Sequence, residues 1–125
     1  MPEVTDGMSY AVPDDLRRVR AFVTERALAL GLPRARVDAL TLAVSELTTN
    51  TLQHTSGGGH IRIWTEDGRL VCDVVDEGAD RPFGRAMPSA DAVRGRGLAI
   101  VELVCDSVYT TAVPGGTLVR ICLDL

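Results

Sequence analysis

The sequence lacks several features that would place the chain in or across a membrane. It contains no apolar run of the roughly 20 residues that a spanning helix needs. The first twelve residues carry Glu3 and Asp6 and lack a basic patch followed by an apolar core, so we expect no secretion signal. Cys72, Cys105 and Cys122 include no close C-x-x-C pair, which argues against zinc. Each lies in an apolar run, which is typical of a buried free thiol. Free thiols are typical of a reducing compartment, and we therefore expect a cytoplasmic protein.

The sequence also lacks a surplus of positive charge. Its formal net charge is −4, so we expect neither direct nucleic-acid binding nor a membrane surface as partner. A weakly acidic protein can still bind a nucleotide through a local positive pocket. The chain has no internal repeat, low-complexity tract or linker, and 125 residues suit a single domain spanning residues 1–125.

Helical periodicity dominates the first half of the chain. Pro13 and Asp14 are typical of a helix start, and Gly31 is a natural stop, which predicts a helix over Asp14–Leu30. Pro33 opens a second helix that runs to about His54. The apolar positions are Leu16, Val19, Val23, Ala27 and Leu30 in the first helix, and Val37, Leu40, Val44 and Leu47 in the second.

Strand-like segments make up most of the second half. Asp67–Gly68 and Pro114–Gly115 are typical hairpin turns, and Gly97–Val104 is expected to be a short helix. The expected strands are Met8–Val12 at an edge, His60–Thr65, Arg69–Asp76, Val108–Thr111 and Thr117–Leu123. This order predicts an α/β two-layer sandwich with the helices on one face of a mostly antiparallel, mixed sheet.

Polar residues recur along one row of the second predicted helix. Glu46, Asn50 and His54 are spaced at i, i+4 and i+8, so they lie nearly above one another. A carboxylate and a carboxamide one turn apart could act as a base and a metal ligand. A solvated polar stripe would have the same spacing, and the row alone favours that simpler interpretation.

Asp76 argues against the simpler interpretation. Alternation along its strand places it on the same face as Leu70, Cys72 and Val74, which should point toward the helices. A carboxylate directed into the space between layers needs donors, because an unpaired buried charge is costly. Asp76 could be a turn aspartate, but the exocyclic amine of a purine would also serve as donor. Gly78 would let such a ring approach the backbone closely.

A long loop over residues 77–96 leads into Gly95-Arg96-Gly97-Leu98. Glycines at a helix start leave N–H groups free, and that end of a helix favours an anion. Ordinary helix starts also use glycine, so this signal is weak alone. The loop concentrates positive charge that suits a phosphate, although loop arginines are often merely solvated. The arginines are Arg81, Arg85, Arg94 and Arg96.

Together these segments resemble the GHKL superfamily of gyrase-type and histidine-kinase-type ATPases. Glu46-Leu-Thr-Thr-Asn50-Thr-Leu-Gln-His54 resembles its N box, and Asp76-Glu-Gly78 its adenine-binding D-x-G box. Gly95-Arg-Gly97-Leu98 resembles the second glycine box, and Gly116-Thr117 the threonine element near adenine. Four elements in the right order over roughly residues 37–120 are specific as a set. Within the superfamily, the chain is most similar to the anti-sigma-factor serine/threonine kinases of bacterial partner-switching systems.

The resemblance implies the ATP-binding fold of that superfamily, often called the Bergerat fold, and a set of roles. Asp76 would bind the adenine amine, Asn50 would ligate Mg²⁺, and Glu46 would be the catalytic base. Residues 79–96 would form the ATP lid. The implied nucleotide-binding residues are Asn50, Asp76, Gly78, Arg94, Gly95, Gly97, Leu98 and Thr117. One asparagine suffices for magnesium, which keeps water and phosphate ligands.

Two departures from the family pattern stand out. The first glycine box often reads D-x-G-x-G, whereas position 80 here is Asp80. The segment before Pro13, which contributes to homodimerisation in the family, is poor in strand formers. The resemblance therefore implies a homodimer less firmly than it implies an ATP site.

Three functions remain open from the sequence. The first is a kinase that uses ATP and Mg²⁺, phosphorylates a serine or threonine of an antagonist protein, and sequesters a sigma factor. The second is an ATP-dependent binding module without phosphotransfer, and the third is a detached histidine-kinase-type catalytic domain. Arg17, Arg18 and Arg20 are expected on the solvated side of the first helix, a region that meets partners in the resembled kinases. Trp64 is expected on the open sheet face.

Overall fold

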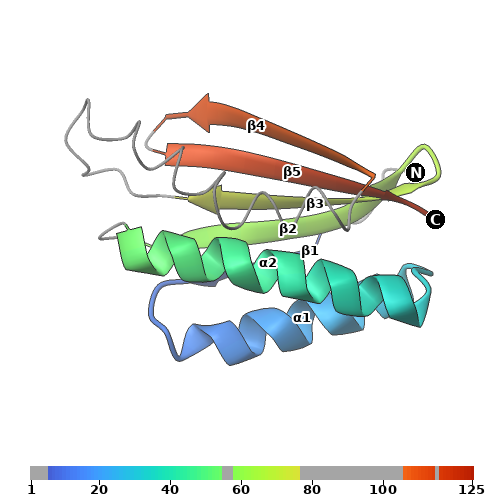
Figure 1. Cartoon of the computed structure of the whole chain (residues 1–125), viewed down its shortest axis with the longest axis horizontal. Helices are drawn as coiled ribbons and strands as arrows, with labels where there is room; N and C mark the ends of the chain where they lie inside the picture. Colours follow the sequence, from blue (N-terminus) through green and yellow to red (C-terminus); the bar gives the residue numbers. More distant parts are fainter. Residues whose placement is uncertain (1–5, 55–57, 77–105, 115) are drawn as a thin grey trace.

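The computed structural model describes residues 6–54, 58–76, 106–114 and 116–125, with the side chains of residues 53 and 54 excepted. The elements in chain order are β1 (Asp6–Tyr10), α1 (Asp15–Ala29), α2 (Arg34–His54), β2 (Gly59–Glu66), β3 (Arg69–Asp76), β4 (Ser107–Val113) and β5 (Gly116–Asp124). The strand order is β1-β2-β3-β5-β4. Figure 1 shows α1 and α2 lying side by side over one face of this sheet. The predicted two-layer sandwich is confirmed, and within the described residues every strand pairing is antiparallel rather than mixed.

The start of α1 differs from the expected cap. Asp14 makes no side-chain capping bond. The carboxylate of Asp15 instead accepts the backbone N–H groups of Ala11 at 2.8 Å and Val12 at 3.2 Å. These two hydrogen bonds, and then one from Arg18, lower the pKa of Asp15. They also explain why β1 ends at Tyr10 rather than at the expected Val12, because the next two N–H groups are already bonded to the helix start.

The end of α1 follows the sequence expectation. Gly31 adopts a φ of +102°, a conformation that other residues rarely take. The N–H of Leu32 donates to the carbonyl of Ala27, and that of Gly31 to the carbonyl of Leu28, both at 3.1 Å. This pair of bonds is the Schellman motif, which satisfies the last carbonyls of a helix. The chain therefore turns sharply into α2.

The core lies between the helices and the sheet. The residues predicted to be apolar contacts on both helices are buried, apart from Leu16 and Leu30, which are half-buried. The main contributors are Val19, Val23, Ala27, Val37, Leu40, Val44, Leu47, Ile61, Ile63, Leu70, Cys72, Val74, Val119, Ile121 and Leu123. Among the described residues, no helix is both long and apolar enough to cross a bilayer.

Both predicted hairpins are present. Asp67 and Gly68 have φ values of 53° and 77°, as the two central residues of a type I′ turn require. The turn brings Glu66 opposite Arg69 and sets the register of β2 against β3. In the second hairpin Val113 pairs with Gly116. The expected helix at Gly97–Val104 and the loop over residues 77–96 lie outside the described residues.

The sheet face opposite the helices carries an ion cluster that the sequence analysis did not find. Asp73 is fully buried on this face. Arg120 donates to its two carboxylate oxygens at 2.7 and 2.9 Å, and Arg62 contacts one of them at 3.4 Å. The three residues stand directly opposite one another on β2, β3 and β5. The Arg120 guanidinium also lies 5.3 Å from the ring centroid of Trp64, which confirms that this tryptophan is on the open face.

We expect the two partners of this buried pair to differ in their effect on stability. Arg120→Met would leave the Asp73 carboxylate buried with only the longer contact to Arg62, at a cost of about 3 kcal/mol. Asp73→Leu should cost less than half as much, because the two arginine side chains, 45% and 41% exposed, can turn to water. The double variant should be close to Asp73→Leu alone. Urea unfolding measures all three, and equal, additive losses would contradict the expectation.

We also expect an acid-dependent contribution from Asp106, which joins α2 to the C-terminal strand. The N–H of Asp124 and then the Arg36 side chain donate to its carboxylate and lower its pKa below the ordinary 3.8. A carboxylate whose pKa is lower in the folded state than in the unfolded state stabilises the fold at pH values above its unfolded-state pKa. This contribution is lost as the pH falls through the folded-state pKa. Asp106→Asn should therefore lower the unfolding midpoint at pH 7, and the difference from wild type should shrink below pH 3.8.

The control for Asp106 is Asp38→Asn, which removes a 69% exposed carboxylate that contacts only Arg34, at 3.6 Å. It should change the midpoint little at any pH. A difference between wild type and Asp106→Asn that persists unchanged into acid would contradict the assignment.

Candidate functional site

Five chain segments converge at one end of the sandwich. Figure 1 shows that α2 ends at the same edge at which β3 ends and β5 begins. The start of β2 and the end of β1 lie there as well, since Tyr10 pairs with Gly59 and Gly59 with Asp76. Antiparallel pairing produces this arrangement, because alternate strand ends meet at each edge of the sheet. Residues that are distant in the sequence therefore become neighbours.

Asn50 is the most unusual polar residue at this edge. It is only 5% exposed, and its side-chain nitrogen has no hydrogen-bond partner in the part of the chain that the structure describes. Thr48 and Thr51 beside it are also buried, but their hydroxyls donate to the carbonyls of Val44 and Leu47 one turn earlier. An unsatisfied buried amide costs free energy unless a ligand supplies the missing partner. Asn50 therefore suits a phosphate oxygen as acceptor or, through its amide oxygen, a cation.

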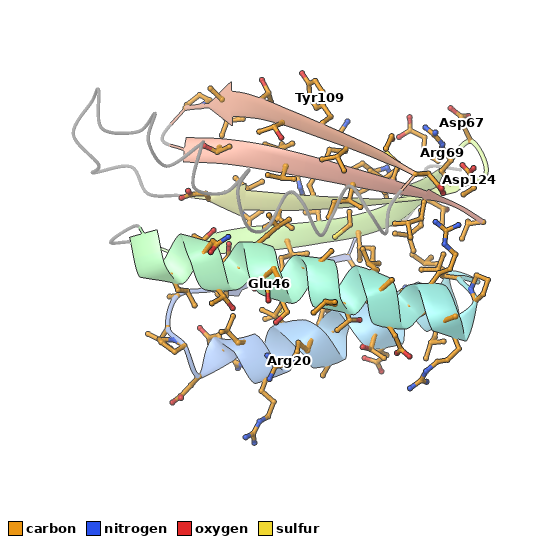
Figure 2. The ribbon with its side chains drawn as sticks, viewed as in Figure 1. Arg20, Glu46, Asp67, Arg69, Tyr109 and Asp124 are labelled. Carbon is orange, nitrogen blue, oxygen red and sulfur yellow. The ribbon has the colours of Figure 1, made fainter. Side chains whose placement is uncertain are left out.

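Glu46 lies one helical turn before Asn50 on the same row of α2. Its side chain is half-buried, so water or a ligand can reach it. Figure 2 shows Glu46 on α2 and Arg20 on α1, and the Arg20 guanidinium lies 3.5 Å from the hydroxyl of Ser45, the residue before Glu46. The row predicted from the sequence is thus present in α2 for Glu46 and Asn50. His54 is the last residue of the helix, and its side chain lies outside the described part.

Asp76 is the last residue of β3 and is half-buried. The residues that alternate with it on the helix-facing side, Leu70, Cys72 and Val74, are 0%, 0% and 3% exposed. The helix-facing side of β3 is therefore apolar along its length and ends in one accessible carboxylate.

Thr117 stands opposite Asp76 in the register. It lies on the same sheet face as Val119 and Ile121, and its side chain is half-buried. The pairing of β3 with β5 thus brings together two residues, 41 positions apart in the sequence, that were expected to contact the base. The remaining expected contacts, Gly78, Arg94, Gly95, Gly97 and Leu98, lie outside the described residues.

A cluster of metal-binding side chains is not found in the described ranges, where no group of three or more His, Cys, Asp or Glu residues could hold an ion. Magnesium commonly uses only one or two protein ligands and takes the rest from phosphates and water. The amide oxygen of the buried Asn50 is the atom that could serve as such a ligand, and its amide nitrogen could donate to a phosphate oxygen. The residues present are therefore compatible with a magnesium ion that arrives with a phosphate ligand.

The far end of the sheet contrasts with this edge. Figure 2 shows Asp67, Arg69 and Asp124 gathered there, away from the end of α2. Arg69 pairs with Asp124 at 3.2 Å, and the side chains there are well exposed. Arg69 and Asp124 thus satisfy one another at an exposed end of the sheet.

Similarity to known structures is clear at the level of the fold. The RsbU and RsbW domains of Rv1364c from Mycobacterium tuberculosis superpose with a TM-score of 0.76 at 20% identity, over 99% of this chain and 33% of that one. The histidine kinase AdeS of Acinetobacter baumannii gives 0.52 at 12% identity, over 95% and 67%. A blue-light activated histidine kinase domain from Erythrobacter litoralis EL346 gives 0.52 at 21% identity, over 98% and 69%.

The chain thus spans one third of the Rv1364c structure. No curated protein matches the sequence significantly. Residues 10–123, which include both helices, the strands β2 to β4 and all but the last residue of β5, match the family described as the histidine kinase-like ATPase domain. The match contains every described residue of the candidate site, and this chain belongs to the family of histidine kinase-like ATPase domains.

Proposed function

We propose that this chain is an ATP- and Mg²⁺-dependent protein kinase that phosphorylates a serine or threonine of an antagonist protein and also sequesters a sigma factor. Family membership supports ATP binding and kinase-type chemistry. The finer assignment is supported by the N-box sequence and by the similar fold of a structure that contains an RsbW domain. The observation that carries the proposal is Asn50, whose buried side-chain nitrogen has no partner among the described residues, one turn from the accessible carboxylate of Glu46.

Each described residue then has a distinct task. Asp76 accepts a hydrogen bond from the adenine amine, with Thr117 opposite it on β5. Asn50 holds Mg²⁺, which supplies positive charge that offsets the charge of the phosphates. Glu46 orients the acceptor hydroxyl and accepts its proton. A carboxylate suits this role because phosphoryl transfer depends mainly on positioning and electrostatics.

The rest of the proposal concerns residues and partners beyond the described site. Residues 79–96 form the ATP lid, and Gly78, Arg94, Gly95, Gly97 and Leu98 contact the nucleotide. The sequence from 1 to 125 acts as one domain and pairs as a homodimer. Arg17, Arg18 and Arg20 form the partner-binding surface. All three arginines are exposed on α1, and Arg17 and Arg20 line a shallow hollow that includes the partly exposed Leu28.

Two other functions are tested by the same experiments. An ATP-dependent binding module would use Asn50 and Asp76 but not Glu46 as a base. A detached histidine-kinase-type catalytic domain is favoured by the two histidine kinases of similar fold. That domain would transfer phosphate to a histidine, which acid treatment distinguishes from phosphoserine.

We expect Asp76→Asn to weaken ATP binding by about ten- to hundredfold. The amide is a weaker acceptor than the carboxylate, and its own N–H groups oppose the adenine amine. Loss of a charge-assisted hydrogen bond costs about 1.5–3 kcal/mol. Titration calorimetry with ATP and Mg²⁺ measures the change. Asp67→Asn, the same substitution at the opposite end of the β2–β3 hairpin, is the control and should bind like wild type. Equal affinity of wild type and Asp76→Asn would contradict the base-binding role.

We expect Glu46→Gln to separate catalysis from binding. ATP affinity should stay within a few-fold, while phosphotransfer to the antagonist falls by at least roughly a hundredfold. Asn50→Ala should differ by losing Mg²⁺-dependent binding as well. Radiolabelled ATP, with candidate antagonist proteins as acceptors, measures transfer, and calorimetry measures affinity.

Glu66→Gln, an equivalent change at an exposed residue at the far end of β2, is the control for Glu46 and should leave both quantities unchanged. Undiminished phosphotransfer by Glu46→Gln would exclude Glu46 as the catalytic base. A wild type that binds its partners and ATP without any transfer would make the binding module the better interpretation.

A further inference from the structure

The two edge strands of the sheet differ in how they are protected against pairing with another chain. Among the described residues, β1 and β4 each pair with a strand on one side only, and Figure 1 shows β4 as the outermost strand at its side of the sheet. An edge strand exposes a row of backbone N–H and C=O groups that another strand can bond. Natural edges are usually shortened, interrupted by proline or a bulge, or marked by a charge, and these devices oppose such pairing.

The edge strand β1 carries several of these protections. It has five residues, and the first of them, Asp6, is charged and lies 2.6 Å from the Nε atom of Arg26. The two N–H groups that follow the strand, those of Ala11 and Val12, already donate to the carboxylate of Asp15. β1 therefore offers a neighbouring strand only a short edge, with a charge at its start and bonded N–H groups beyond its end.

The edge strand β4 carries none of these protections along its seven residues, Ser107–Val113. The segment Ser-Val-Tyr-Thr-Thr-Ala-Val has no charged residue and no proline, and β-branched and aromatic residues, which favour strands, make up most of it. Its register with β5 is continuous, so no bulge interrupts it. The charge just before it, on Asp106, already accepts hydrogen bonds from Arg36 and from the N–H of Asp124. The exposed residues of β4 are Ser107, Tyr109, Thr110 and Ala112.

We propose that β4 is the edge through which two copies of this chain associate, by antiparallel pairing about a twofold axis at Thr110. The inference rests on the homodimer of the proposed function and names its interface. Antiparallel pairing of identical strands about such an axis is isologous, so one surface serves both copies. The axis is perpendicular to the sheet, which becomes continuous across the two copies with both helix layers on the same face.

The side chains of β4 complement one another in this register. Thr110 is the middle residue of the strand and stands opposite Thr110 of the second copy. Tyr109 then lies opposite Thr111, and both are on the sheet face away from the helices. Val108 lies opposite Ala112 on the other face. Pairs of threonines and pairs of an aromatic with a β-branched residue stabilise antiparallel strands when they are directly opposite, and no like charges meet in this arrangement.

The test places a charge at the twofold axis, where it meets its own copy. Thr110→Lys puts two lysines directly opposite each other, which opposes pairing. Because Thr110 is exposed, the variant should keep its fold and its ATP affinity, which calorimetry checks. Sedimentation velocity over roughly a hundredfold range of protein concentration measures association. The dissociation constant of the dimer should rise by about tenfold or more.

A mixture of Thr110→Lys and Thr110→Glu chains tests the register itself. The two variants place opposite charges at the axis, so they should associate with each other more tightly than either does with itself. Ser9→Lys, a charge added at an exposed residue of the other edge strand, is the control and should associate like wild type. Because β1 belongs to the segment to which the family resemblance assigns dimerisation, this control also tests that alternative.

The outcomes separate this interface from the rest of the proposed function. A wild-type dimer that Thr110→Lys leaves unchanged would overturn the β4 interface and leave the homodimer standing. Loss of the dimer in Ser9→Lys alone would assign the interface to β1. A wild type that binds ATP but stays monomeric throughout would reject the homodimer and this interface together. Protection of the β4 amides from hydrogen exchange only after an antagonist protein is added to monomeric chains would assign the edge to that protein instead of a second copy.

Discussion

The packing of α2 onto the apolar face of the sheet is the contact on which the other features depend. Val37, Leu40, Val44 and Leu47 bury one stripe of the helix against strands whose helix-facing residues are equally apolar. Because that stripe faces the sheet, the neighbouring polar row of Glu46 and Asn50 has a fixed position around the helix as well. Glu46 stays partly accessible, and Asn50 enters the edge of the core with its amide nitrogen unsatisfied. A rotation of α2 that relieved Asn50 would expose the apolar stripe, so the hydrophobic contact holds a polar group in a costly position.

Strand alternation places the two aspartates of β3 on opposite faces of the sheet, one in an ion cluster and the other at the candidate site. Asp73 and Asp76 are three residues apart, so they point to opposite faces of the sheet. Asp73 is buried under a bidentate Arg120 and is already satisfied within the protein. Asp76 ends the strand on the helix-facing side, partly accessible, among residues that are otherwise apolar. The first carboxylate lies in the ion cluster on the open face of the sheet, and the second lies at the edge that holds the candidate site.

The edge that holds the candidate site is also where the chain makes its closest backbone approaches. Gly59 allows β1, β2 and β3 to come together beneath the end of α2 without an intervening side chain. A half-buried Asp76 at the end of β3 and a buried Asn50 on α2 give this edge two polar groups from two elements. Preorganisation of that kind lowers the entropic cost of binding, since the groups need not be ordered when the ligand arrives.

Much of the fold could be predicted from local patterns. Helical spacing and the Pro33 and Gly31 signals predicted both helices nearly to the residue, and Asp67–Gly68 predicted the first hairpin. Alternation predicted that Asp76 shares a face with Leu70, Cys72 and Val74, and the family motifs gave the expected partners. These signals are local because backbone conformation and face are set by neighbours in the sequence.

Other features depended on pairing between distant segments, which no local pattern contains. The sequence showed Asp73 and Arg120 only as charges within apolar strands, and the register of β3 against β5 made them a buried ion pair. It placed the end of β1 at Val12, whereas the hydrogen bonds of Asp15 end it at Tyr10. It gave no sign that Tyr10 pairs with Gly59 and Gly59 with Asp76, because those pairings arise only from the register of β1, β2 and β3. The sequence by itself thus determined which residues form helices and strands and which faces are apolar. The tertiary structure alone decided which charges meet and which polar groups are left for a ligand, because those depend on strand register and helix packing.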